Sequence, residues 1–568
     1  MSAAETSAWL QHYPEWTPHQ LDYADVTLVD VYNANMNRCP DNPATWFFGR
    51  THTYAEIDEL VKKAAAGLRA LGVRKGDRVA ILLPNCPQHF VAFWAVQYIG
   101  ATAVEHNPLY TTHELRGPFQ NHEARVAIAW DKIASTVVGP LRADTPLETI
   151  ISVNMIEEMP TLQRFALKLP IPKLKNLREQ LSGPAPDTIA WSALLEMAQV
   201  PDHFPTEELV KDDVALILYT SGTTGKPKGA QLTHGNLYAN ILQGKAWVRG
   251  LGDQDERMLA ALPGFHAYGL TFNFTLPMLV GGEVIFLPSP KIPLIMDVMK
   301  KHTPTFVPGV PTLYEKIIEA AEEQNITIDG IRASFCGAAT LPVATVEKWE
   351  SLTGGHLIEG YGLTETSPVI VGNPMNSDRR PGYVGIPFPD TQVRIANPEN
   401  PSETMPDGEE GEVLVRGPQV FKGYLNNQEA TDAAFHDGWF RTGDVGIMEP
   451  DGFIRLVARI KEVIITGGFN VYPAEVEEAL RPHPDIQDLA VVGRPRSDGA
   501  EDVVACVTLR EGAALDPEGL KEYARQRLTR YKVPRTFYHF EELARDQMGK
   551  IRRREVHEDL LKLLEDGK

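Results

Sequence analysis

Residues 219–229 combine the side chains that proteins use to hold a polyphosphate. They read Tyr-Thr-Ser-Gly-Thr-Thr-Gly-Lys-Pro-Lys-Gly. Glycines let backbone N–H groups turn toward one anion, hydroxyls add neutral donors, and lysines balance the charge. A Gly/Ser/Thr-rich surface loop is the alternative, whereas a Walker-type loop is excluded because Pro227 stands where that motif needs Ser or Thr. The residues expected to hold phosphate are Thr220, Ser221, Gly222, Thr223, Thr224, Gly225, Lys226 and Lys228.

The run before this loop predicts the sheet that positions it. Residues 214–218 are a short apolar run typical of a buried strand, so the loop should emerge at the end of a sheet. Residues 55–110 alternate between helical spacing and buried apolar runs, and the same succession recurs over 284–308. Such alternation is typical of a layered, doubly wound α/β fold with ligand loops at the strand ends.

The second half of the chain changes in composition. Residues 377–458 are dense in Gly, Pro and Asp with short alternating runs, which predicts hairpins in a small β subdomain. Residues 474–528 predict a helix, two strands and a second helix, which suits a small α+β domain. Because 568 residues exceed what one core organises, we expect an N-terminal domain over 1–458 and a C-terminal domain over 459–568.

Composition restricts the partners of the chain. A net charge of −20 argues against nucleic acid, since binding to a phosphate backbone needs a positive surface. Four widely separated cysteines suggest neither a zinc site nor a disulfide framework. The N-terminus lacks the pattern of a secretory signal, and no apolar run reaches spanning length. We therefore expect a cytoplasmic protein, with a homodimer left open.

Residues 155–181 depart from this acidic pattern. Their central part is apolar and basic with almost no acid, so it could lie on an anionic membrane surface as a weak peripheral contact. Its prolines break any long helix, and a surface excursion packed on its own protein is an equally good interpretation.

Four further motifs follow the phosphate loop in order. They are residues 359–366 (Glu-Gly-Tyr-Gly-Leu-Thr-Glu-Thr), 438–444 (Gly-Trp-Phe-Arg-Thr-Gly-Asp), 459–475 (Arg-Ile-Lys-Glu leading to Gly-Gly-Phe-Asn-Val-Tyr-Pro-Ala-Glu) and 548–550 (Met-Gly-Lys). With the loop, they closely resemble the adenylate-forming superfamily of acyl-CoA synthetases, luciferases and peptide-synthetase adenylation domains. The N-terminal context and residues 468–473 are most similar to bacterial long-chain fatty acid–CoA ligases.

That resemblance implies an AMP-forming ligase that uses ATP, Mg²⁺ and CoA. A carboxylate would attack the α-phosphate of ATP to give acyl-AMP and pyrophosphate, and the CoA thiol would then displace AMP. Both steps concentrate negative charge, so a preorganised cationic site is needed. The phosphate loop would hold the β- and γ-phosphates, Thr364 would contact the α-phosphate, and Thr220 and Glu365 would help to hold Mg²⁺.

The resemblance also assigns the remaining nucleotide contacts. Asp444 would accept hydrogen bonds from the ribose hydroxyls, and Arg459 would add a second contact to ribose or phosphate. Tyr361 offers a ring face to adenine. The other residues implied in ATP or AMP binding are Gly337, Ala338, Ala339, Glu359 and Gly362.

Lys550 is implied as the main catalyst of adenylation. Its ammonium would bridge the attacking carboxylate and the α-phosphate. The alternative is one more lysine in the basic tail that contains Arg552 to Arg554, and the preceding Met-Gly favours catalysis. In the family the small domain swings after the first step, which would place the hinge at Lys461. Gly467, Gly468 and Phe469 would then border the CoA site.

The carboxylate and its chain would lie near His266. This residue is expected to position or gate the substrate, because a lone histidine is more often structural than catalytic. Phe265, His266, Gly309 and Gly337 are predicted to line the acyl pocket, where small residues leave room for a flexible alkyl chain.

Three positions depart from the family pattern. Ala458 replaces an acid before Arg459, Ile465 replaces a lysine common in aryl ligases, and no proline precedes the final Gly-Lys.

A medium-chain or aryl (4-coumarate-type) ligase remains an alternative. A fatty acyl-AMP ligase that does not use CoA is disfavoured because residues 444–461 carry no insertion. A non-catalytic nucleotide-binding protein should have lost Glu365 or Lys550, and both are present.

Overall fold

The chain divides into two compact units. The structure, a computed structural model, describes residues 7–566 except 202–207, 221–226, 338–340, 460, 461, 463, 467, 468, 497–500, 529, 547 and 548. Unit 1 comprises residues 1–392 and 415–440, and unit 2 comprises residues 393–414 and 441–568. The predicted α/β class is confirmed, while the predicted domain boundary at residue 459 stays a prediction.

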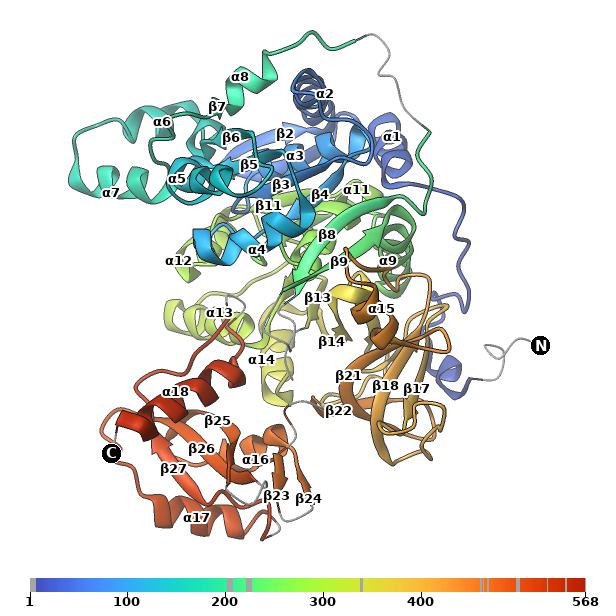
Figure 1. The fold of residues 1–568 in the computed structure, drawn as a ribbon, viewed down its shortest axis with the longest axis vertical. Helices are drawn as coiled ribbons and strands as arrows, with labels where there is room; N and C mark the ends of the chain where they lie inside the picture. Colours follow the sequence, from blue (N-terminus) through green and yellow to red (C-terminus); the bar gives the residue numbers. More distant parts are fainter. Residues whose placement is uncertain are drawn as a thin grey trace. The chain divides into compact units, whose positions relative to one another are not determined.

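One sheet of unit 1 contains the two strands that flank the phosphate loop. Over the described residues its order is β19-β9-β8-β4-β3-β5-β6-β7 (Figure 1). Neighbouring strands from β8 to β7 run parallel, whereas β9 and β19 are antiparallel to their neighbours. The strands are β3 (Arg78–Leu82), β4 (Thr102–Glu105), β5 (Val126–Trp130), β6 (Thr149–Val153), β7 (Ile189–Ala190), β8 (Val214–Thr220), β9 (Lys228–Thr233) and β19 (Gly423–Tyr424). The predicted buried strand before the loop is therefore confirmed as β8.

The second sheet of unit 1 carries the next motif. Its described strands are ordered β16-β15-β14-β13-β12-β10-β11-β1-β2, with a parallel centre and antiparallel edges. They are β1 (Pro43–Phe47), β2 (Arg50–Thr53), β10 (Arg257–Ala260), β11 (Glu283–Phe286), β12 (Phe306–Gly309), β13 (Ala333–Cys336), β14 (His356–Gly362), β15 (Val369–Gly372) and β16 (Ile386–Pro387). Such a sheet presents its loops at the strand ends, where ligands bind in this fold class.

An almost wholly buried helix lies between the two sheets. Helix α3 (Pro87–Tyr98) contacts β3 and β4 of one sheet and β1 of the other. All its residues except Tyr98 are buried, which is the pattern of a helix covered on every side. By contrast α2 (Tyr54–Ala70) is amphipathic, and it begins where the Thr53 side chain accepts a hydrogen bond from the Glu56 amide. These two helices confirm the helical spacing read from residues 55–99.

Unit 2 contains most of a five-stranded sheet. Its described strands run in the order β17-β18-β21-β20, with β22 also paired to β21. They are β17 (Gln392–Ala396), β18 (Glu410–Arg416), β20 (Phe435–His436), β21 (Trp439–Met448) and β22 (Ile454–Arg459). The sheet occupies the Gly- and Pro-rich stretch from which hairpins were expected. A short hairpin, β23 (Ile464–Thr466) with β24 (Phe469–Val471), follows it.

The C-terminal part of unit 2 is a three-layer α/β sandwich. Its sheet contains β25 (Ile486–Pro495), β26 (Glu501–Leu509) and β27 (Thr536–His539) among the residues described. Successive residues of β25 face opposite sides: Leu489 and Val491 pack with α16 (Pro473–Leu480) and α17 (Pro517–Arg525), whereas Ala490 and Val492 pack with α18 (Arg553–Asp566). This period of two lets one short sheet bury both faces.

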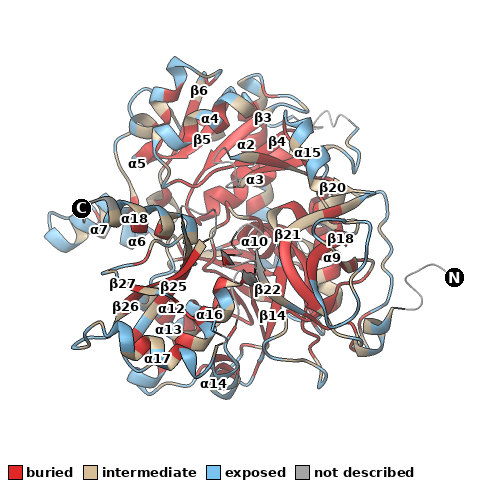
Figure 2. Cartoon of the chain, turned by 60° about the horizontal axis from the view of Figure 1, so that its bottom comes forward, coloured by how far each residue is buried: buried red, intermediate tan, exposed pale blue. Residues whose placement is uncertain are grey.

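The basic segment forms two short helices of unit 1, α6 (Thr161–Ala166) and α7 (Pro172–Leu181). Both are largely exposed (Figure 2). Along the described stretches of the chain, no helix combines the length and the apolar character needed to cross a bilayer. Cys39, Cys86, Cys336 and Cys506 are free thiols.

Candidate active site

A hairpin forms the base of the phosphate loop. Thr220, the last residue of β8, pairs with Lys228, the first residue of the antiparallel β9. The six loop residues from Ser221 to Lys226 lie outside the described residues. Because a strand follows the loop, the anion would be met by loop amides and side chains, unlike a P-loop, where a helix begins at the phosphate.

Tyr424 connects two of the predicted site residues in unit 1. The Nζ of Lys228 lies 5.0 Å from the centroid of the Tyr424 ring, and the Tyr424 hydroxyl donates a hydrogen bond of 2.8 Å to Oε1 of Glu365. Burial and the Glu365 carboxylate raise the pKa of Tyr424, so the phenol keeps its proton and remains a donor. The positive and the acidic residue of the predicted ATP site are thus held by one aromatic side chain.

Glu365 is fixed by its backbone as well as by Tyr424. It lies in the short helix η7 (Thr364–Thr366) after β14, and only 8% of its surface is exposed. Its carbonyl accepts a 2.8 Å hydrogen bond from the Phe421 amide. A carboxylate and a threonine hydroxyl are hard oxygen donors of the kind that Mg²⁺ prefers, so the chemistry of Glu365 and Thr220 fits the predicted metal role.

The strand before Glu365 carries the predicted adenine contacts. In β14, Gly362 is required by its surroundings, because a Cβ there would lie 2.0 Å from the carbonyl oxygen of Pro368. Tyr361 is almost buried. Ala338 and Ala339 lie outside the described residues.

Glu359 in the same strand is a buried acid with an unusual pKa. One oxygen, Oε1, accepts a hydrogen bond of 3.3 Å from the Leu341 amide, and Oε2 has no partner among the described residues. Burial raises the pKa of Glu359 to about 8. The carboxyl group is therefore largely neutral at physiological pH and can donate a hydrogen bond as well as accept one.

The predicted carboxylate site contains more aromatic surface than expected. His266 precedes α10 (Ala267–Leu270), and its ring lies 4.9 Å from that of Phe265. A Cβ on Gly337 would lie 3.2 Å from the Tyr268 ring, and one on Gly309 would lie 2.8 Å from the Tyr314 ring. The space beside both glycines is thus filled by tyrosines, and their contact with an acyl chain stays a prediction.

An apolar cavity adjoins these aromatic side chains. It is small, with room for about one water molecule. Helix α9 (His234–Trp247) forms one wall. Phe272 and Phe335, whose ring centroids are 5.5 Å apart, also line the cavity. The lining comprises Asn240, Ile241, Gly244, Trp247, Val248, Thr271, Phe272, Leu276, Phe335, Val369 and Phe388. None of the four residues predicted for the acyl pocket is among these lining residues, and the sequence did not predict the wall from α9.

In unit 2, the predicted ribose ligands are neighbours. Asp444 in β21 is directly opposite Arg459 in β22, and Asp444 is 5% exposed. The preceding residues are held by Glu412 of β18, whose Oε2 receives two hydrogen bonds from Arg441, of 2.9 and 2.6 Å. The Gly443 amide donates to Oε1 of Glu412 at 3.2 Å. The register thus brings both predicted residues together, although the Arg459 side chain is outside the described part.

The remaining predicted residues of unit 2 are placed only in part. Lys550 is exposed and follows Gly549, whose φ of +79° lies in the left-handed region. Lys461, Gly467 and Gly468 fall outside the described residues, as does the Phe469 side chain. The hinge and the CoA contacts therefore stay predictions.

Comparison with known sequences decides the family. Residues 32–425 match the AMP-binding enzyme family, and residues 475–550 match the AMP-binding enzyme C-terminal domain. The chain belongs to the AMP-binding enzyme family. The resemblance to adenylate-forming enzymes that the motifs suggested is thereby confirmed.

Two relatives and one solved structure resemble almost the whole chain. A long-chain-fatty-acid–CoA ligase of Bacillus subtilis (strain 168) is 37% identical over 560 residues, covering 97% of this chain and 98% of the relative. A feruloyl-CoA synthase of Amycolatopsis sp is 34% identical over 527 residues, covering 93% and 97%. The ATP-bound crystal structure of MatB from Rhodopseudomonas palustris has a TM-score of 0.80 at 29% identity, covering 94% and 99%.

Proposed function

We propose that this protein activates a long-chain fatty acid with ATP and transfers the acyl group to CoA. The carrying observation is full-length similarity to long-chain-fatty-acid–CoA ligases, at 37% identity for the Bacillus subtilis relative. The small apolar cavity along α9 marks a place where an alkyl chain could begin to pack, since such a chain is bound chiefly by apolar surface removed from water.

Each of the two half-reactions would use a different set of the predicted site residues. In the first, a carboxylate oxygen bonds to the α-phosphorus as the bond to pyrophosphate breaks. The loop from Thr220 to Lys228 would hold the departing phosphates, Thr364 would contact the α-phosphate, and Lys550 would offset the developing charge. Mg²⁺, held by Glu365 and Thr220, would supply charge neutralisation on the phosphates.

In the second half-reaction, the CoA sulfur attacks the acyl carbon, AMP leaves, and the thiol loses its proton. Asp444 and Arg459 would retain the ribose of the adenylate, with Tyr361 and residues 337–339 around adenine. We propose that the domain over 459–568 turns about Lys461 between the steps, so that residues 467–469 meet CoA. His266 would position the carboxylate.

Product analysis tests the reaction. The purified enzyme is incubated with ATP, Mg²⁺ and acids from acetate to oleate, with and without CoA, and AMP and pyrophosphate are followed. Turnover with long acids that requires CoA and yields AMP is expected. Formation of ADP, or turnover that needs no CoA, would overturn the assignment. Ferulate and 4-coumarate serve as parallel substrates, because preference for them would establish the aryl alternative.

The cavity offers a direct test of chain-length selection. Gly244 lines it from α9, and no atom lies within 4 Å of the position that a Cβ would take there. Gly244→Ala should therefore add a methyl group to the cavity wall without a steric clash, and Gly244→Leu adds a larger apolar side chain at the same position. We expect the ratio of activity on oleate to activity on octanoate to fall from the parent through Ala to Leu. An unchanged ratio in the Leu variant would place the acyl chain elsewhere.

We also propose that α6 and α7 rest on an anionic membrane, where long-chain fatty acids accumulate. Five apolar side chains of the two helices and the linker between them are exposed: Leu162 by 84%, Phe165 by 63%, Leu169 by 49%, Ile171 by 47% and Leu177 by 39%. The two helices and their linker, residues 161–181, carry five basic residues and one acid in a chain of net charge −20. Exposed apolar side chains among basic ones are typical of a surface that binds anionic lipid.

Vesicle sedimentation distinguishes the partners of this surface. Binding to mixed phosphatidylglycerol and phosphatidylcholine vesicles, weakened by salt and absent with phosphatidylcholine alone, is expected. The double change Leu162→Ser with Phe165→Ser should abolish binding, whereas Leu109→Ser, at another exposed leucine of unit 1, should not. Binding retained by the double variant would refute the proposal. Loss of a homodimer in that variant, without vesicle binding by the parent, would instead make the surface a contact between two copies.

A further inference from the structure

Lys550 ends a tight turn at the edge of a small hairpin. The Asp546 amide donates to the Lys550 carbonyl at 2.8 Å, and the Lys550 amide donates to Oδ1 of Asp546 at 2.9 Å. Arg545 and Ile551 face each other in an isolated antiparallel bridge. The Lys550 backbone is therefore held by its own turn, but Gly549 beside it has a left-handed backbone that other residues rarely adopt.

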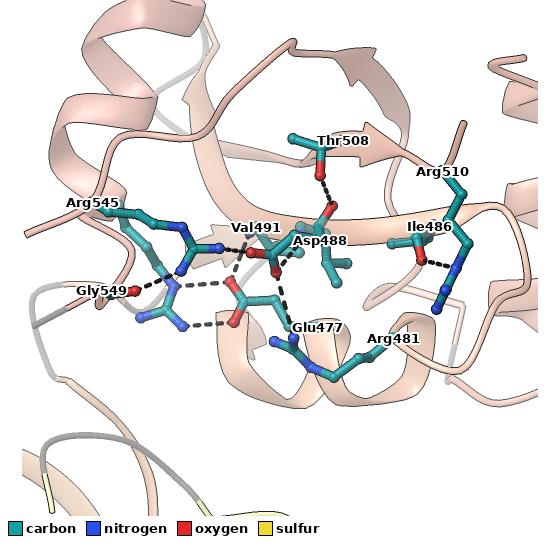
Figure 3. A network of polar contacts seen from close by, with 11 residues as sticks. Glu477, Arg481, Ile486, Asp488, Val491, Thr508, Arg510, Arg545 and Gly549 are labelled. Carbon is teal, nitrogen blue, oxygen red and sulfur yellow. Dashed lines mark hydrogen bonds and ion pairs between the residues drawn. The ribbon is translucent and has the colours of Figure 1, made fainter. Parts of the chain in front are cut away.

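Arg545 connects this turn to the sheet of unit 2. One of its guanidinium nitrogens donates to the Gly549 carbonyl at 2.5 Å, and the other pairs with Oδ2 of Asp488 in β25. Figure 3 shows the guanidinium between the two acceptors. Asp488 is itself fixed, because its Oδ1 accepts a 2.8 Å hydrogen bond from the Leu489 amide. A planar guanidinium suits such a bridge because its donors have a fixed direction.

A second arginine anchors the chain just beyond the turn. Arg553, at the start of α18, makes two hydrogen bonds to Glu477 of α16, of 2.9 and 2.6 Å. Its side chain is 20% exposed and that of Glu477 is 7% exposed, so this pair belongs to the interior of unit 2. The Arg545 side chain is 35% exposed. The Arg553 pair thus secures the fold, whereas the Arg545 pair acts on the residue next to Lys550.

We propose that Asp488 and Arg545 are positioning residues for Lys550 in the adenylation step. This inference rests on the proposed catalytic role of Lys550. By holding the Gly549 carbonyl, the Asp488–Arg545 pair fixes the peptide from which the Lys550 side chain extends. The ammonium then spends less time away from the position where charge develops, which lowers the entropic cost of the first half-reaction.

The two half-reactions separate positioning from stability. Acid-dependent exchange of pyrophosphate into ATP measures adenylation, and CoA consumption from supplied oleoyl-AMP measures thioester formation. We expect Arg545→Gln and Asp488→Asn each to slow adenylation about 10- to 100-fold, as for a catalytic group misplaced by about 1 Å. Thioester formation and the KM for ATP should stay close to the parent values. Equal losses in both half-reactions, or no loss in adenylation, would overturn the proposal.

Three further variants make the test specific. Arg510→Gln removes an arginine that contacts the Ile486 carbonyl at 3.2 Å, at the start of β25, and should leave both half-reactions unchanged. Arg545→Lys keeps the charge and should recover part of the adenylation rate. In a Lys550→Ala background, Arg545→Gln should cost nothing further, since the pair acts through the lysine. An added loss there would overturn the proposal.

Failure of the proposal can be told from failure of the role proposed for Lys550. If Lys550→Ala slows adenylation selectively and Arg545→Gln does not, the positioning role alone is wrong. If Lys550→Ala affects both half-reactions equally, the catalytic assignment is wrong and the inference falls with it. Thermal unfolding of each variant shows whether it is folded.

Discussion

The two lysines of the proposed site are held in different ways. Lys228 begins a paired strand and packs against Tyr424, which in turn binds a carboxylate that is 8% exposed. Lys550 is exposed at the end of a turn, and its neighbour Gly549 is held by the half-exposed Arg545. Sheet pairing and burial fix the first lysine, whereas hydrogen bonds and one ion pair fix the second.

The contrast suits the two tasks. The sites for phosphate and metal must be formed before the chemistry begins, so a rigid site inside a packed sheet reduces the cost of ordering it. A lysine that assists one step can sit on an exposed turn, because its contact must be made and then withdrawn. We therefore expect substitutions in unit 2 to slow one half-reaction more than the other. Substitutions in unit 1 should have effects that depend most strongly on ligand concentration.

The largest effect is expected for Lys550→Ala. Loss of one preorganised charge should lower the adenylation rate about 10²- to 10³-fold, the range seen when one transition-state donor is removed. The KM for ATP should change little, since the exposed side chain acts on charge that develops only in the transition state. Single-turnover formation of acyl-AMP measures this loss. A rise in KM with an unchanged rate would make Lys550 a ground-state ligand like Lys228.

A smaller, concentration-dependent effect is expected for Glu365→Gln. Removing the buried charge should weaken the site for Mg²⁺ about 10- to 100-fold, as when the surroundings of a metal site are disrupted. Initial rates measured against Mg²⁺ concentration at saturating ATP should show the shift, with partial recovery at high Mg²⁺. Glu429→Gln, at an exposed acid of unit 1, is the matched control. A loss that Mg²⁺ does not relieve would contradict a metal role.

Two variants of Tyr424 test how the rigid region is held. Tyr424→Phe keeps the ring beside Lys228 but removes the hydrogen bond to Glu365, which at about 1 kcal/mol corresponds to a 2- to 10-fold loss of activity. Tyr424→Leu also removes the ring face and should cost more. Steady-state kinetics with ATP and Mg²⁺ varied separately will show both effects. Equal behaviour of the two variants would mean that the ring does not hold Lys228.

Local pattern in the sequence predicted the part of the fold that depends on it. The run over 214–218 became β8, and the helical spacing over 55–71 became α2, because buried strands and amphipathic helices impose their own periods. The motif order also predicts that Glu365 and Asp444 belong to one site, which stays a prediction. These residues required no knowledge of the chain's packing.

Residues that meet across long sequence distances could not be predicted. Tyr424 belongs to a two-residue strand whose partner, Ala230, is far away in the chain, and so short a strand has no pattern of its own. Gly244 reads as an ordinary helical glycine until α9 is seen beside the cavity. Arg545 belongs to none of the predicted motifs, and its bridge between Asp488 and Gly549 became visible only through β25.

The smallest effect concerns Glu359, whose buried carboxyl group in β14 keeps its proton and is therefore neutral. Its pKa is raised from 4.5 to about 8 by burial, so between these values the folded chain holds a proton that the unfolded chain has lost. Its contribution to stability is therefore full below about pH 4.5 and is lost as pH rises through about 8. The midpoint temperature of thermal unfolding of the parent should fall, relative to that of Glu359→Gln, as the pH rises from about 4.5 to about 8. Parallel pH profiles would show that the Glu359 carboxyl is ionised in the folded protein, and that burial in β14 is compensated by a partner charge.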